Sequence, residues 1–341
     1  MAAELSTERR RVVAITGASA GVGRATALAF ARRGWAVALM ARDEGRLRSA
    51  EAAVRASGGR ALVIPTDVAD ANGMFEAADA IARAWGRLDV WVNNAMATVF
   101  APAEEIAPEE FRRVAEVTYL GQVHGTLAAL RHMRRQRHGT IVQVGSALAY
   151  RSIPLQSAYC AAKAAVRGFT DSLRSELIHL GSPIRLTMVH LPAINTPQFD
   201  WARSRLPRRL QPVPPIHEPE VAAEAVYRAA REAPRELWVG GPTVQAIMGT
   251  MAAPGLLDRL MARRAWDGQM TAEPASERPG NLFRPVAGDW GVRGRFTPVS
   301  KRRAVAAPAS RVRALGAAAG IGVVALAALA ARRARTSRAR R

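Results

Sequence analysis

The sequence feature that most constrains the fold is a glycine-rich turn between a strand pattern and a helix pattern. Residues 11–15 form a short apolar run rich in β-branched side chains, and residues 24–34 have a helical pattern that ends at a glycine. Glycines in the turn between them permit a close approach of the backbone that a Cβ would block. A strand, a glycine turn and a helix in this order place a pyrophosphate on backbone N–H groups at the helix N-terminus. We therefore predict a nucleotide-binding site on the turn Thr16-Gly17-Ala18-Ser19-Ala20-Gly21-Val22-Gly23.

The chain continues to alternate between strand and helix patterns up to residue 245. Strands that alternate with helices imply a parallel sheet covered by helices on both faces. Residues 8–245 are therefore expected to form one α/β domain with a Rossmann-type, doubly wound parallel sheet. The further strands are predicted at residues 35–40, 61–65, 88–92, 140–146, 184–189 and 237–241.

The chain beyond residue 245 is expected to extend this domain. Residues 244–266 have a helical pattern, whereas residues 267–300 are rich in proline and glycine and show little periodicity. We therefore expect an irregular or helical extension at 246–300, followed by a basic tail at 301–341. The sequence assigns no function to the extension.

One of the few lysines of the chain follows a tyrosine by four residues. Only two of the 49 basic residues are lysines, and one of them is Lys163, four positions after Tyr159. Lysine is a compact cation whose pKa can be tuned, unlike that of arginine. Residues four apart share one face of a helix, and an ammonium beside a phenol lowers the pKa of the tyrosine. The pair predicts a proton donor that works near neutral pH, and the alternative is a chance pair on a solvated helix.

Several motifs occurring in one order resemble the classical short-chain dehydrogenase/reductase family over roughly residues 8–245. The resemblance implies hydride transfer between a nicotinamide cofactor and the carbon of a carbonyl or secondary alcohol. In the family, the residue matching Tyr159 gives or takes the proton of the reacting oxygen, and the one matching Ser146 hydrogen-bonds that oxygen. The residue matching Lys163 lowers the pKa of the tyrosine and holds the nicotinamide ribose. The motifs are the turn at 16–23, Asp67-Val68, Asn93-Asn94-Ala95, Ser146, Tyr159-x3-Lys163 and the segment at 192–196.

The resemblance also implies which residues bind the cofactor. The family uses the pair at 67–68 beside the adenine, the triplet at 93–95 beside the cofactor and as a brace of the sheet, and the turn at 192–197 to close over the cofactor. The expected cofactor-binding residues are Thr16, Gly17, Ser19, Gly21, Val22, Gly23, Arg42, Asp67, Val68, Asn94, Ala95, Tyr159, Lys163, Pro192, Ile194 and Thr196.

The end of the second predicted strand points to the choice of cofactor. In dinucleotide-binding folds a carboxylate at this strand end accepts a hydrogen bond from the adenosine ribose, whereas an arginine accommodates a 2′-phosphate. Arg42 precedes Asp43 in the turn, which favours NADP(H) over NAD(H). The alternative is that Arg42 caps the strand end and Asp43 binds the ribose, in which case NAD(H) would be used.

One position departs from the family pattern. The fourth helix of the family usually carries an asparagine that holds a water for proton relay to the lysine, and Thr118 takes that position here. A threonine hydroxyl has one donor and two lone pairs and is able to hold a water, so Thr118 is a fourth candidate catalytic residue. The alternative is that Thr118 only donates to a carbonyl of its own helix. Met96 and Ala193 also stand where the family often has glycine.

The substrate side of the site is predicted to be apolar, which fits a lipid-like or aromatic carbonyl or the corresponding alcohol. Residues 200–220 contain five prolines and interrupt the alternation of strands and helices. In the family the segment after the sixth strand covers the substrate, and the alternative is a surface excursion. The candidate substrate-contacting residues are Ser146, Leu148, Gln156, Tyr159 and Phe199, with Tyr150, Ile153, Ile194 and Trp201 as further apolar neighbours.

Other residue types bear on metals and on the cellular compartment. The six histidines show no metal-ligand spacing, so we expect no metal. The single cysteine, Cys160, excludes an intrachain disulfide and fits a reducing compartment. The first ten residues lack the apolar core of a signal peptide. A cytoplasmic catalytic domain is expected, and a homo-oligomer is left open.

The tail at 301–341 contains eleven basic residues and no acidic one, and supplies +11 of the formal net charge of +21. Within it, residues 314–331 form an uncharged stretch of 18 residues, half of them alanine. As a helix this stretch would span roughly 27 Å, close to the ~30 Å hydrocarbon core of a bilayer. We expect membrane association through a transmembrane helix at 314–331. The alternatives are a basic tail lying on anionic lipid and, least favoured, a tail that binds nucleic acid.

Two functions for the whole protein remain. The first is an NADP(H)-dependent oxidoreductase of the short-chain type, tethered by its tail. The second is a membrane-tethered NADP(H)-binding scaffold or sensor with weakened catalysis. The complete set of Ser146, Tyr159 and Lys163 favours the first, whereas Thr118 and the basic tail keep the second open.

Overall fold

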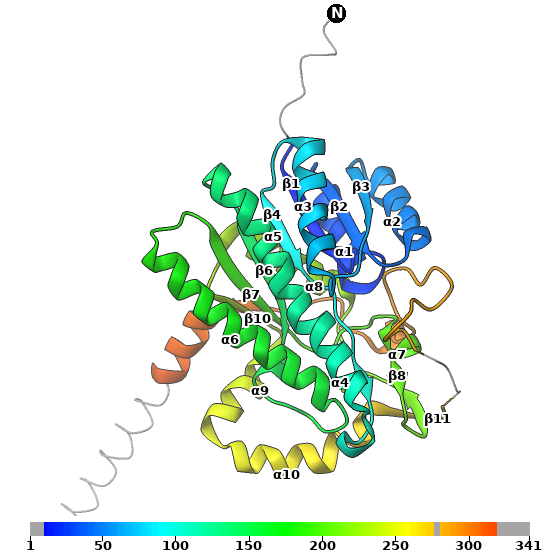
Figure 1. Ribbon diagram of the computed structural model, residues 1–341. Helices are drawn as coiled ribbons and strands as arrows, with labels where there is room; N and C mark the ends of the chain where they lie inside the picture. Colours follow the sequence, from blue (N-terminus) through cyan, green and yellow to red (C-terminus); the bar gives the residue numbers. More distant parts are fainter. Residues whose placement is uncertain (1–9, 276–279, 319–341) are drawn as a thin grey trace, which may run out of the picture.

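The computed structural model describes residues 10–275 and 280–318, and its centre is an eight-stranded sheet (Figure 1). The strand order is β12-β10-β7-β6-β4-β1-β2-β3. Seven strands are parallel, and β12 runs antiparallel to β10. The order runs outward in two directions from β1 and β4, so the sheet is doubly wound. The strands are β1 (Val12–Thr16), β2 (Ala36–Ala41), β3 (Arg60–Pro65), β4 (Val90–Asn93), β6 (Thr140–Ser146), β7 (Arg185–Leu191), β10 (Glu236–Val239) and β12 (Ala306–Pro308).

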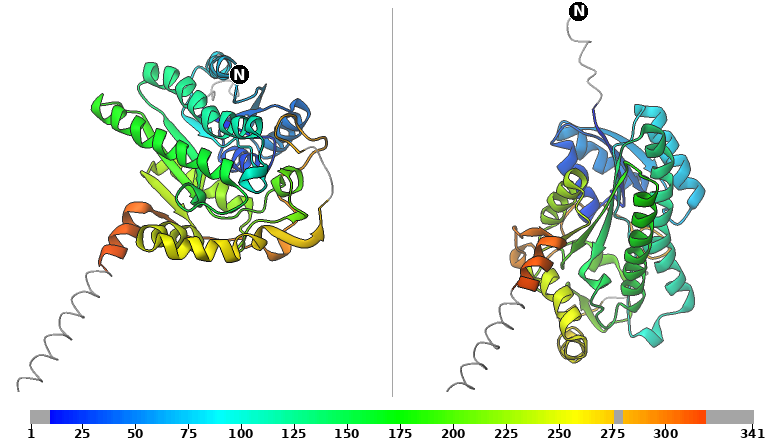
Figure 2. Two further views of the ribbon diagram at one scale, coloured as in Figure 1. Left: turned by 60° about the horizontal axis from the view of Figure 1, so that its bottom comes forward. Right: turned by 90° about the vertical axis from the view of Figure 1, so that its left-hand side faces the viewer.

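Helices cover both faces of this sheet, as the side view in Figure 2 shows. Helices α1, α2 and α8 pack on one face, and α3, α5 and α6 pack on the other. Two short two-stranded sheets lie outside the main one, formed by β5 (Val99–Phe100) with β8 (Arg203–Ser204), and by β9 (Arg208–Leu210) with β11 (Met270–Pro274). The helices are α1 (Gly21–Ala31), α2 (Glu44–Ala56), α3 (Ala71–Trp85), α4 (Pro108–Ala115), α5 (Gly121–Gln136), α6 (Ser157–His179), α7 (Gln198–Trp201), α8 (Pro219–Glu232), α9 (Gly241–Ala252) and α10 (Pro254–Arg264).

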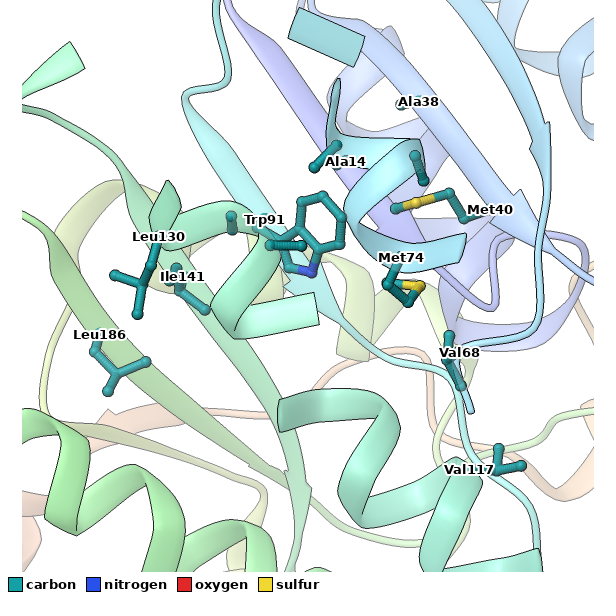
Figure 3. Packing of buried hydrophobic residues seen from close by; sticks show 14 of the residues in the cluster. Ala14, Ala38, Met40, Val68, Met74, Trp91, Val117, Leu130, Ile141 and Leu186 are labelled. Atoms are coloured by element: carbon teal, nitrogen blue, oxygen red, sulfur yellow. The ribbon is translucent and has the colours of Figure 1, made fainter. Parts of the chain in front are cut away.

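Each face of the sheet has its own apolar core, because successive side chains along a strand point to opposite faces. In β1, Val13 and Ile15 belong to the core beneath α1 and α8, whereas Ala14 belongs to the core beneath α3 and α5. Trp91 of β4 is fully buried in this second core, and Figure 3 shows its indole among side chains from several elements, including Ile141. Burial on both faces explains why the strands are nearly continuous apolar runs.

Local capping fixes the start of α2, beside the glycine turn. The carboxylate of Asp43 accepts a hydrogen bond of 3.0 Å from the backbone N–H of Arg46, as an N-cap residue does. The same carboxylate lies 3.5 Å from Nε of Arg46. The side chain of Asp43 is therefore engaged within its own turn.

The predicted α/β fold is confirmed. For each of the seven predicted strands, both ends lie within two residues of the ends of an observed strand. The helical pattern at 244–266 forms two helices, α9 and α10, because proline at position 254 has no N–H to continue the first of them. Within residues 267–300, expected to be irregular, the described residues 267–275 and 280–300 contribute β11 and pack against the domain.

The eighth strand comes from the segment expected to be a tail. β12 pairs with β10, and the N–H of Gly240 donates to the carbonyl of Val305 at 2.9 Å. Ala309 is buried against Trp238 and Ile247, and residues 309–318 are helical. The division of the chain at residues 245 and 300 stays a prediction, but the segment at 301–309 completes the sheet.

Within residues 10–275 and 280–318, we find no helix with the length and apolarity needed to cross a membrane. The predicted transmembrane segment at 314–331 lies outside the described residues from position 319 onward.

Candidate active site

A cavity of about 480 Å³ lies at the carboxyl ends of β1, β2, β6 and β7, where ligands bind in open α/β sheets. It extends from the glycine turn to α9 and α10 and is large enough for a small-molecule ligand. Of the predicted cofactor and substrate residues, all but Thr16 line it, and of the further apolar neighbours all but Tyr150 do. The cofactor and substrate residues among them are Gly17, Ser19, Gly21, Val22, Gly23, Arg42, Asp67, Val68, Asn94, Ala95, Ser146, Leu148, Gln156, Tyr159, Lys163, Pro192, Ile194, Thr196 and Phe199.

The glycine turn needs its glycines for two reasons. Gly17 has a φ of +66°, which L side chains rarely adopt. A Cβ at Gly23 would lie 2.1 Å from the carbonyl oxygen of Gly17, so the helix packs on the turn only without a side chain there. The residue before α1, Ala20, provides no side-chain cap for the helix N–H groups. Gly21 and Val22 of the first helical turn line the cavity, and this cradle fits the pyrophosphate of a dinucleotide.

Thr16 lies behind the turn and braces it. Its hydroxyl accepts hydrogen bonds from the backbone N–H groups of Asn94 and Ala95, at 2.9 and 3.0 Å. The side-chain amide of Asn94 donates to the Thr16 carbonyl at 2.9 Å. The end of β4 is thus fixed to the end of β1, which is the bracing role that the family resemblance implies.

The structure brings Ser146, Tyr159 and Lys163 together. Ser146 ends β6, and its hydroxyl accepts a hydrogen bond of 3.1 Å from the N–H of Leu148 and interacts with the Tyr159 hydroxyl. Tyr159 and Lys163 lie on one face of α6, with Nζ of Lys163 5.7 Å from the centroid of the tyrosine ring. Nζ also donates to the carbonyl of Val144 at 2.7 Å. Three side chains from β6 and α6 therefore converge at one wall of the cavity.

The expected lowering of the Tyr159 pKa is wrong for this structure. Burial raises the pKa of Tyr159 well above its usual range, and the hydrogen bond with Ser146 opposes this only in part. Burial also lowers the pKa of Lys163 to about 7. Desolvation disfavours the charged form of both groups, so the ammonium is itself weakened and does not bring the phenol toward neutral pH.

Thr118 does not make the helix hydrogen bond considered as its alternative. It is fully buried in the π-helical turn Glu116–Leu120 between α4 and α5. Its hydroxyl donates to the Ala97 carbonyl at 2.8 Å and accepts from the Ala97 N–H at 2.9 Å. One acceptor lone pair remains, and Thr118 does not line the cavity. A water held by Thr118 stays a prediction.

The extension crosses the adenosine end of the predicted cofactor groove. We call residues 281–296 the strap. The guanidinium of Arg42 donates to the strap carbonyls of Asn281 at 2.6 Å, Phe283 at 3.0 Å and Leu282 at 3.3 Å. Arg113 also donates to the Leu282 carbonyl at 3.3 Å. Arg42 thus lines the cavity and anchors the strap at the same time.

The strap is fixed to the glycine turn as well. The carboxylate of Asp289 binds Arg24 at 2.7 Å and the Ser49 hydroxyl at 2.5 Å. The carbonyl of Gly291 accepts from the N–H of Gly21 at 3.0 Å. Two strap residues, Asn281 and Pro285, line the cavity, as do Ala246 and Met261 from the earlier part of the extension. The extension therefore forms one wall of the site.

Three residues around this site were missed by sequence reasoning. Arg46 is 7 % exposed and lines the cavity, and its Nη2 has no hydrogen-bond partner in the described part of the chain. Arg46 follows Arg42 by four residues and lies in the first turn of α2. This spacing is the sequence signal that could have identified Arg46 as a candidate. Asn195 lies in the predicted closing turn at 192–197, but no role was assigned to it; it is fully buried and accepts from the N–H of Phe296 at 3.0 Å. Gln269 accepts from the Gln156 amide at 2.7 Å, and no local pattern points to it.

Comparison with known proteins identifies the family. The sequence profile described as short chain dehydrogenase matches residues 11–206, more than half of the chain. The chain belongs to the short-chain dehydrogenase/reductase family. Its members are oxidoreductases that act on CH–OH or C=O groups with NAD(P), and this protein is one of them.

Three curated family relatives show the extent of the similarity. YxnA of Bacillus subtilis, described as an uncharacterized oxidoreductase, is 33 % identical over 279 residues, which cover 81 % of this chain and 78 % of YxnA. SadH of Mycobacterium tuberculosis, described as a putative oxidoreductase, is 31 % identical over 69 % of this chain and 88 % of its own length. A fatty acyl-CoA reductase of Acinetobacter baylyi is 29 % identical over 67 % of this chain and 75 % of the relative.

Solved structures of the family share the fold. A short-chain dehydrogenase from Streptomyces avermitilis superposes with a TM-score of 0.62 at 28 % identity, covering 75 % of this chain and all of that one. A metagenomic short-chain oxidoreductase in complex with NADP gives 0.55 at 27 % identity, covering 65 % and 91 %. An NAD⁺-bound xylitol dehydrogenase gives 0.52 at 30 % identity, covering 54 % and 70 %.

Proposed function

We propose that this short-chain dehydrogenase interconverts an apolar carbonyl compound and its alcohol with NADP(H), and that Ser146, Tyr159 and Lys163 are its catalytic residues. The observation that carries the proposal is the convergence of these three side chains on one wall of a cavity whose far end is the glycine turn. A nicotinamide cofactor with its pyrophosphate on that turn would extend along the cavity toward the three residues.

The roles of the three residues follow from their chemistry. The cofactor supplies or accepts the hydride when bound. In the direction of reduction, Tyr159 donates its hydroxyl proton to the substrate oxygen as the C=O bond becomes C–O–H. Ser146, whose hydroxyl is fixed by the N–H of Leu148, hydrogen-bonds the same oxygen. The ammonium of Lys163 stabilises the phenolate that remains on Tyr159.

Arg42 and Asp43 support NADP(H) as the preferred cofactor. Arg42 lines the cavity at the end of β2, where a guanidinium accommodates a 2′-phosphate. The carboxylate of Asp43 is already engaged as the N-cap of α2, which weakens the alternative that it binds a ribose hydroxyl. Since solved relatives are described with NADP and with NAD⁺, the preference is tested by titrating the protein with both cofactors.

An apolar substrate is supported by apolar side chains around the proposed catalytic residues. Leu148, Ile153 and Phe199 line the cavity with Met261 of α10, whereas Trp201 lies by the strap, with its ring centroid 5.3 Å from the Arg46 guanidinium. The similarity to a fatty acyl-CoA reductase supports a substrate with an aliphatic chain, and the cavity volume of about 480 Å³ allows one.

We also propose a cytoplasmic catalytic domain that associates with membranes through the tail. The excess of basic residues over acidic ones in the tail and the uncharged stretch at 314–331 support it. The scaffold or sensor alternative remains for the case in which the cofactor binds without turnover, and the engagement of Thr118 with Ala97 favours it.

One experiment separates catalysis from the scaffold alternative. NADPH oxidation is followed with a panel of aliphatic aldehydes and ketones of increasing chain length, for the wild type and for Tyr159→Phe. We expect turnover by the wild type, a loss of about 10²-fold or more in Tyr159→Phe, and nearly unchanged NADPH binding, since only the proton donor is removed. Tight NADPH binding with no turnover that depends on Tyr159 would favour the scaffold.

A further inference from the structure

A buried histidine contacts the backbone of the proposed catalytic serine. His190 lies in β7, beside β6, and is fully buried. Its Nδ1 is 3.0 Å from the carbonyl oxygen of Ser146. Because a carbonyl only accepts, Nδ1 carries the hydrogen and donates it. A Cβ at Gly145 would lie 3.0 Å from Nδ1, so the imidazole fits here because residue 145 has no side chain.

The other end of the same loop is held by a buried carboxylate. The loop leaves β6 at Ser146, passes through the short helical turn Ala147–Ala149 and reaches Tyr150. The Tyr150 hydroxyl lies 2.9 and 2.8 Å from the two carboxylate oxygens of Glu236. Glu236 is 3 % exposed and also accepts from Nε1 of Trp238 at 2.9 Å. β7 and β10 thus hold both ends of the serine loop, residues 146–150.

Packing joins this cluster to α6, which carries Tyr159 and Lys163. The Tyr150 ring meets the His190 ring edge to face, with centroids 5.1 Å apart. The guanidinium of Arg167, also in α6, lies 4.3 Å from the centroid of the Tyr150 ring. The serine loop is therefore fixed against the helix that supplies the other two proposed catalytic groups.

The helix that follows β12 reaches the same cluster. Arg313 lies 5.3 Å from the centroid of the Trp238 ring and 3.9 Å from the carboxylate of Glu236. Its side chain is 42 % exposed, so its attraction to Glu236 is screened by solvent. Arg313 closes the cluster on the solvent side.

The charge states agree with this geometry. Burial lowers the pKa of His190, Glu236 opposes this, and the charges of Arg167 and Lys163 add to the lowering. Burial alone would raise the pKa of Glu236, but the donors Trp238 and Tyr150 and the charge of Arg313 oppose it, and that pKa is lowered. A neutral imidazole donates through Nδ1. Its Nε2 lies 3.5 Å from Glu236 and makes no hydrogen bond to any residue that the structure describes.

We propose that His190 and Glu236 are positioning residues of the reaction, which fix the Ser146 hydroxyl by anchoring the two ends of the serine loop. This inference rests on the proposed function, because it assigns Ser146 the reacting oxygen. Neither residue lines the cavity, so both act through the loop. The hydroxyl of Ser146 accepts from the N–H of Leu148 in the same loop, and a shift of the loop therefore moves the hydroxyl. A misplacement of about 1 Å at a reacting group costs as much as ~10²-fold in rate.

A pair of substitutions at His190 tests the donor to Ser146. His190→Leu removes the N–H donor, whereas His190→Asn places an amide N–H near the position of Nδ1. We expect kcat to fall by about 10- to 100-fold in His190→Leu and to recover most of this loss in His190→Asn. The Kd for NADPH, measured by its fluorescence, should remain within about twofold of the wild type in both. Equal kcat in the two variants, whether high or low, overturns the proposal.

A second variant keeps the test decisive if His190→Leu does not fold. Tyr150→Phe keeps the ring against His190 and Arg167 but removes the hydroxyl bound to Glu236. We expect kcat to be about 3- to 10-fold lower than in the wild type, with unchanged NADPH affinity. An unchanged kcat would contradict the role of Glu236 in holding the serine loop. The proposed function fails separately, through a wild type without Tyr159-dependent turnover. If the wild type is active and both Tyr150→Phe and His190→Leu are as active as the wild type, only the positioning role of His190 and Glu236 is rejected.

Discussion

The backbone N–H of Gly21 donates a hydrogen bond to the carbonyl oxygen of Gly291, and the two atoms lie 3.0 Å apart. Gly21 is the first residue of α1 and lines the cavity, whereas Gly291 belongs to the strap. The contact therefore ties the proposed pyrophosphate cradle to the extension. Because Arg42 anchors the same strap at the other side of the groove, we expect the strap to influence how tightly the cofactor is held.

Asp289→Ala tests this influence. The substitution removes the carboxylate that binds Arg24 and Ser49, which should loosen the strap beside the glycine turn. We expect NADPH to bind about 3- to 10-fold more weakly, with a faster dissociation rate, as the loss of one or two charge-assisted hydrogen bonds implies. Stopped-flow fluorescence measures both quantities. Asp258→Ala is the control, since it removes an exposed carboxylate of the same extension that pairs with Arg151. Identical NADPH dissociation in the two variants would show that the strap has no such role.

Arg42→Ala should weaken NADPH far more than NADH. The loss for NADPH is expected to be about 1.5–3 kcal/mol, the range for a hydrogen bond to a charged group. Release of the strap carbonyls should cost both cofactors a smaller, equal amount. Titration of each cofactor by fluorescence measures the difference, and Arg48→Ala, on the exposed side of α2, is the matched control. Equal losses for the two cofactors, or a wild type that prefers NADH, would remove the argument for NADP(H).

The pH dependence of carbonyl reduction should follow Lys163. A lysine is charged below its pKa, and burial lowers the pKa of Lys163 to about 7. The ammonium that stabilises the Tyr159 phenolate is therefore present below about pH 7 and is lost as the pH rises through this value, so kcat should fall on the alkaline side. A pH–rate profile at saturating substrate checks the sign. Constant kcat across the neutral range would show that Lys163 keeps its proton.

Lys163→Arg complements this profile. Arginine keeps a permanent charge, but its planar fork cannot replace a compact ammonium bound to the Val144 carbonyl. We expect little activity at any pH, with NADPH binding reduced because Lys163 is also proposed to hold the nicotinamide ribose. A fully active Lys163→Arg enzyme would show that only the charge matters.

Truncation should separate the sheet from the tail. A chain that ends at residue 318 keeps β12 and the helix at 309–318, and we expect it to stay folded and active but to leave the membrane fraction. A chain that ends at residue 300 lacks β12 and the buried Ala309, and its Tm should be lower by about 4 °C or more. Differential scanning calorimetry and fractionation of cell lysates measure the two effects.

The full-length protein provides the remaining test of the tail. Resistance of the membrane fraction to high salt and to alkaline carbonate is expected for a spanning helix, which is held by apolar burial. Release by high salt would indicate a basic tail on anionic lipid, because charge attraction fades at a Debye length of about 3 Å in 1 M salt. Release by nuclease would indicate nucleic acid and would contradict membrane association.

Local sequence patterns were sufficient to predict seven of the eight strands of the sheet and the position of the site. The β-branched runs and the glycine turn depend only on residues that are close together in the sequence. The seven strands that these patterns predict are present. The carboxyl ends of parallel strands meet at one edge, so Ser146 and the turn at 16–23 were expected to meet there. The geometry of Tyr159 and Lys163 on one helix face likewise follows from their spacing.

The parts that could not be predicted depend on contacts between distant segments. The strap and β12 lack a periodic pattern, and their positions depend on partners such as Arg42 and Val239, far away in the sequence. The pKa of Tyr159 was predicted in the wrong direction because burial, which tertiary packing decides, outweighs the charge of Lys163. The use of Thr118 as a brace for Ala97 depends in the same way on how the π-helical turn packs.

The place of β12 in the sheet also has a consequence for the order of events during synthesis. β10 pairs with β12 only after residues 306–308 leave the ribosome. The seven other strands of the main sheet, β10 included, all end before residue 240. Ribosomes add about 5–20 residues per second, so the edge of β10 stays unpaired for roughly 3–15 s after its own synthesis. An unpaired edge is a template for pairing with another chain. The nascent protein therefore exposes this edge to pairing with other chains during the interval, and slower translation of the extension would lengthen it.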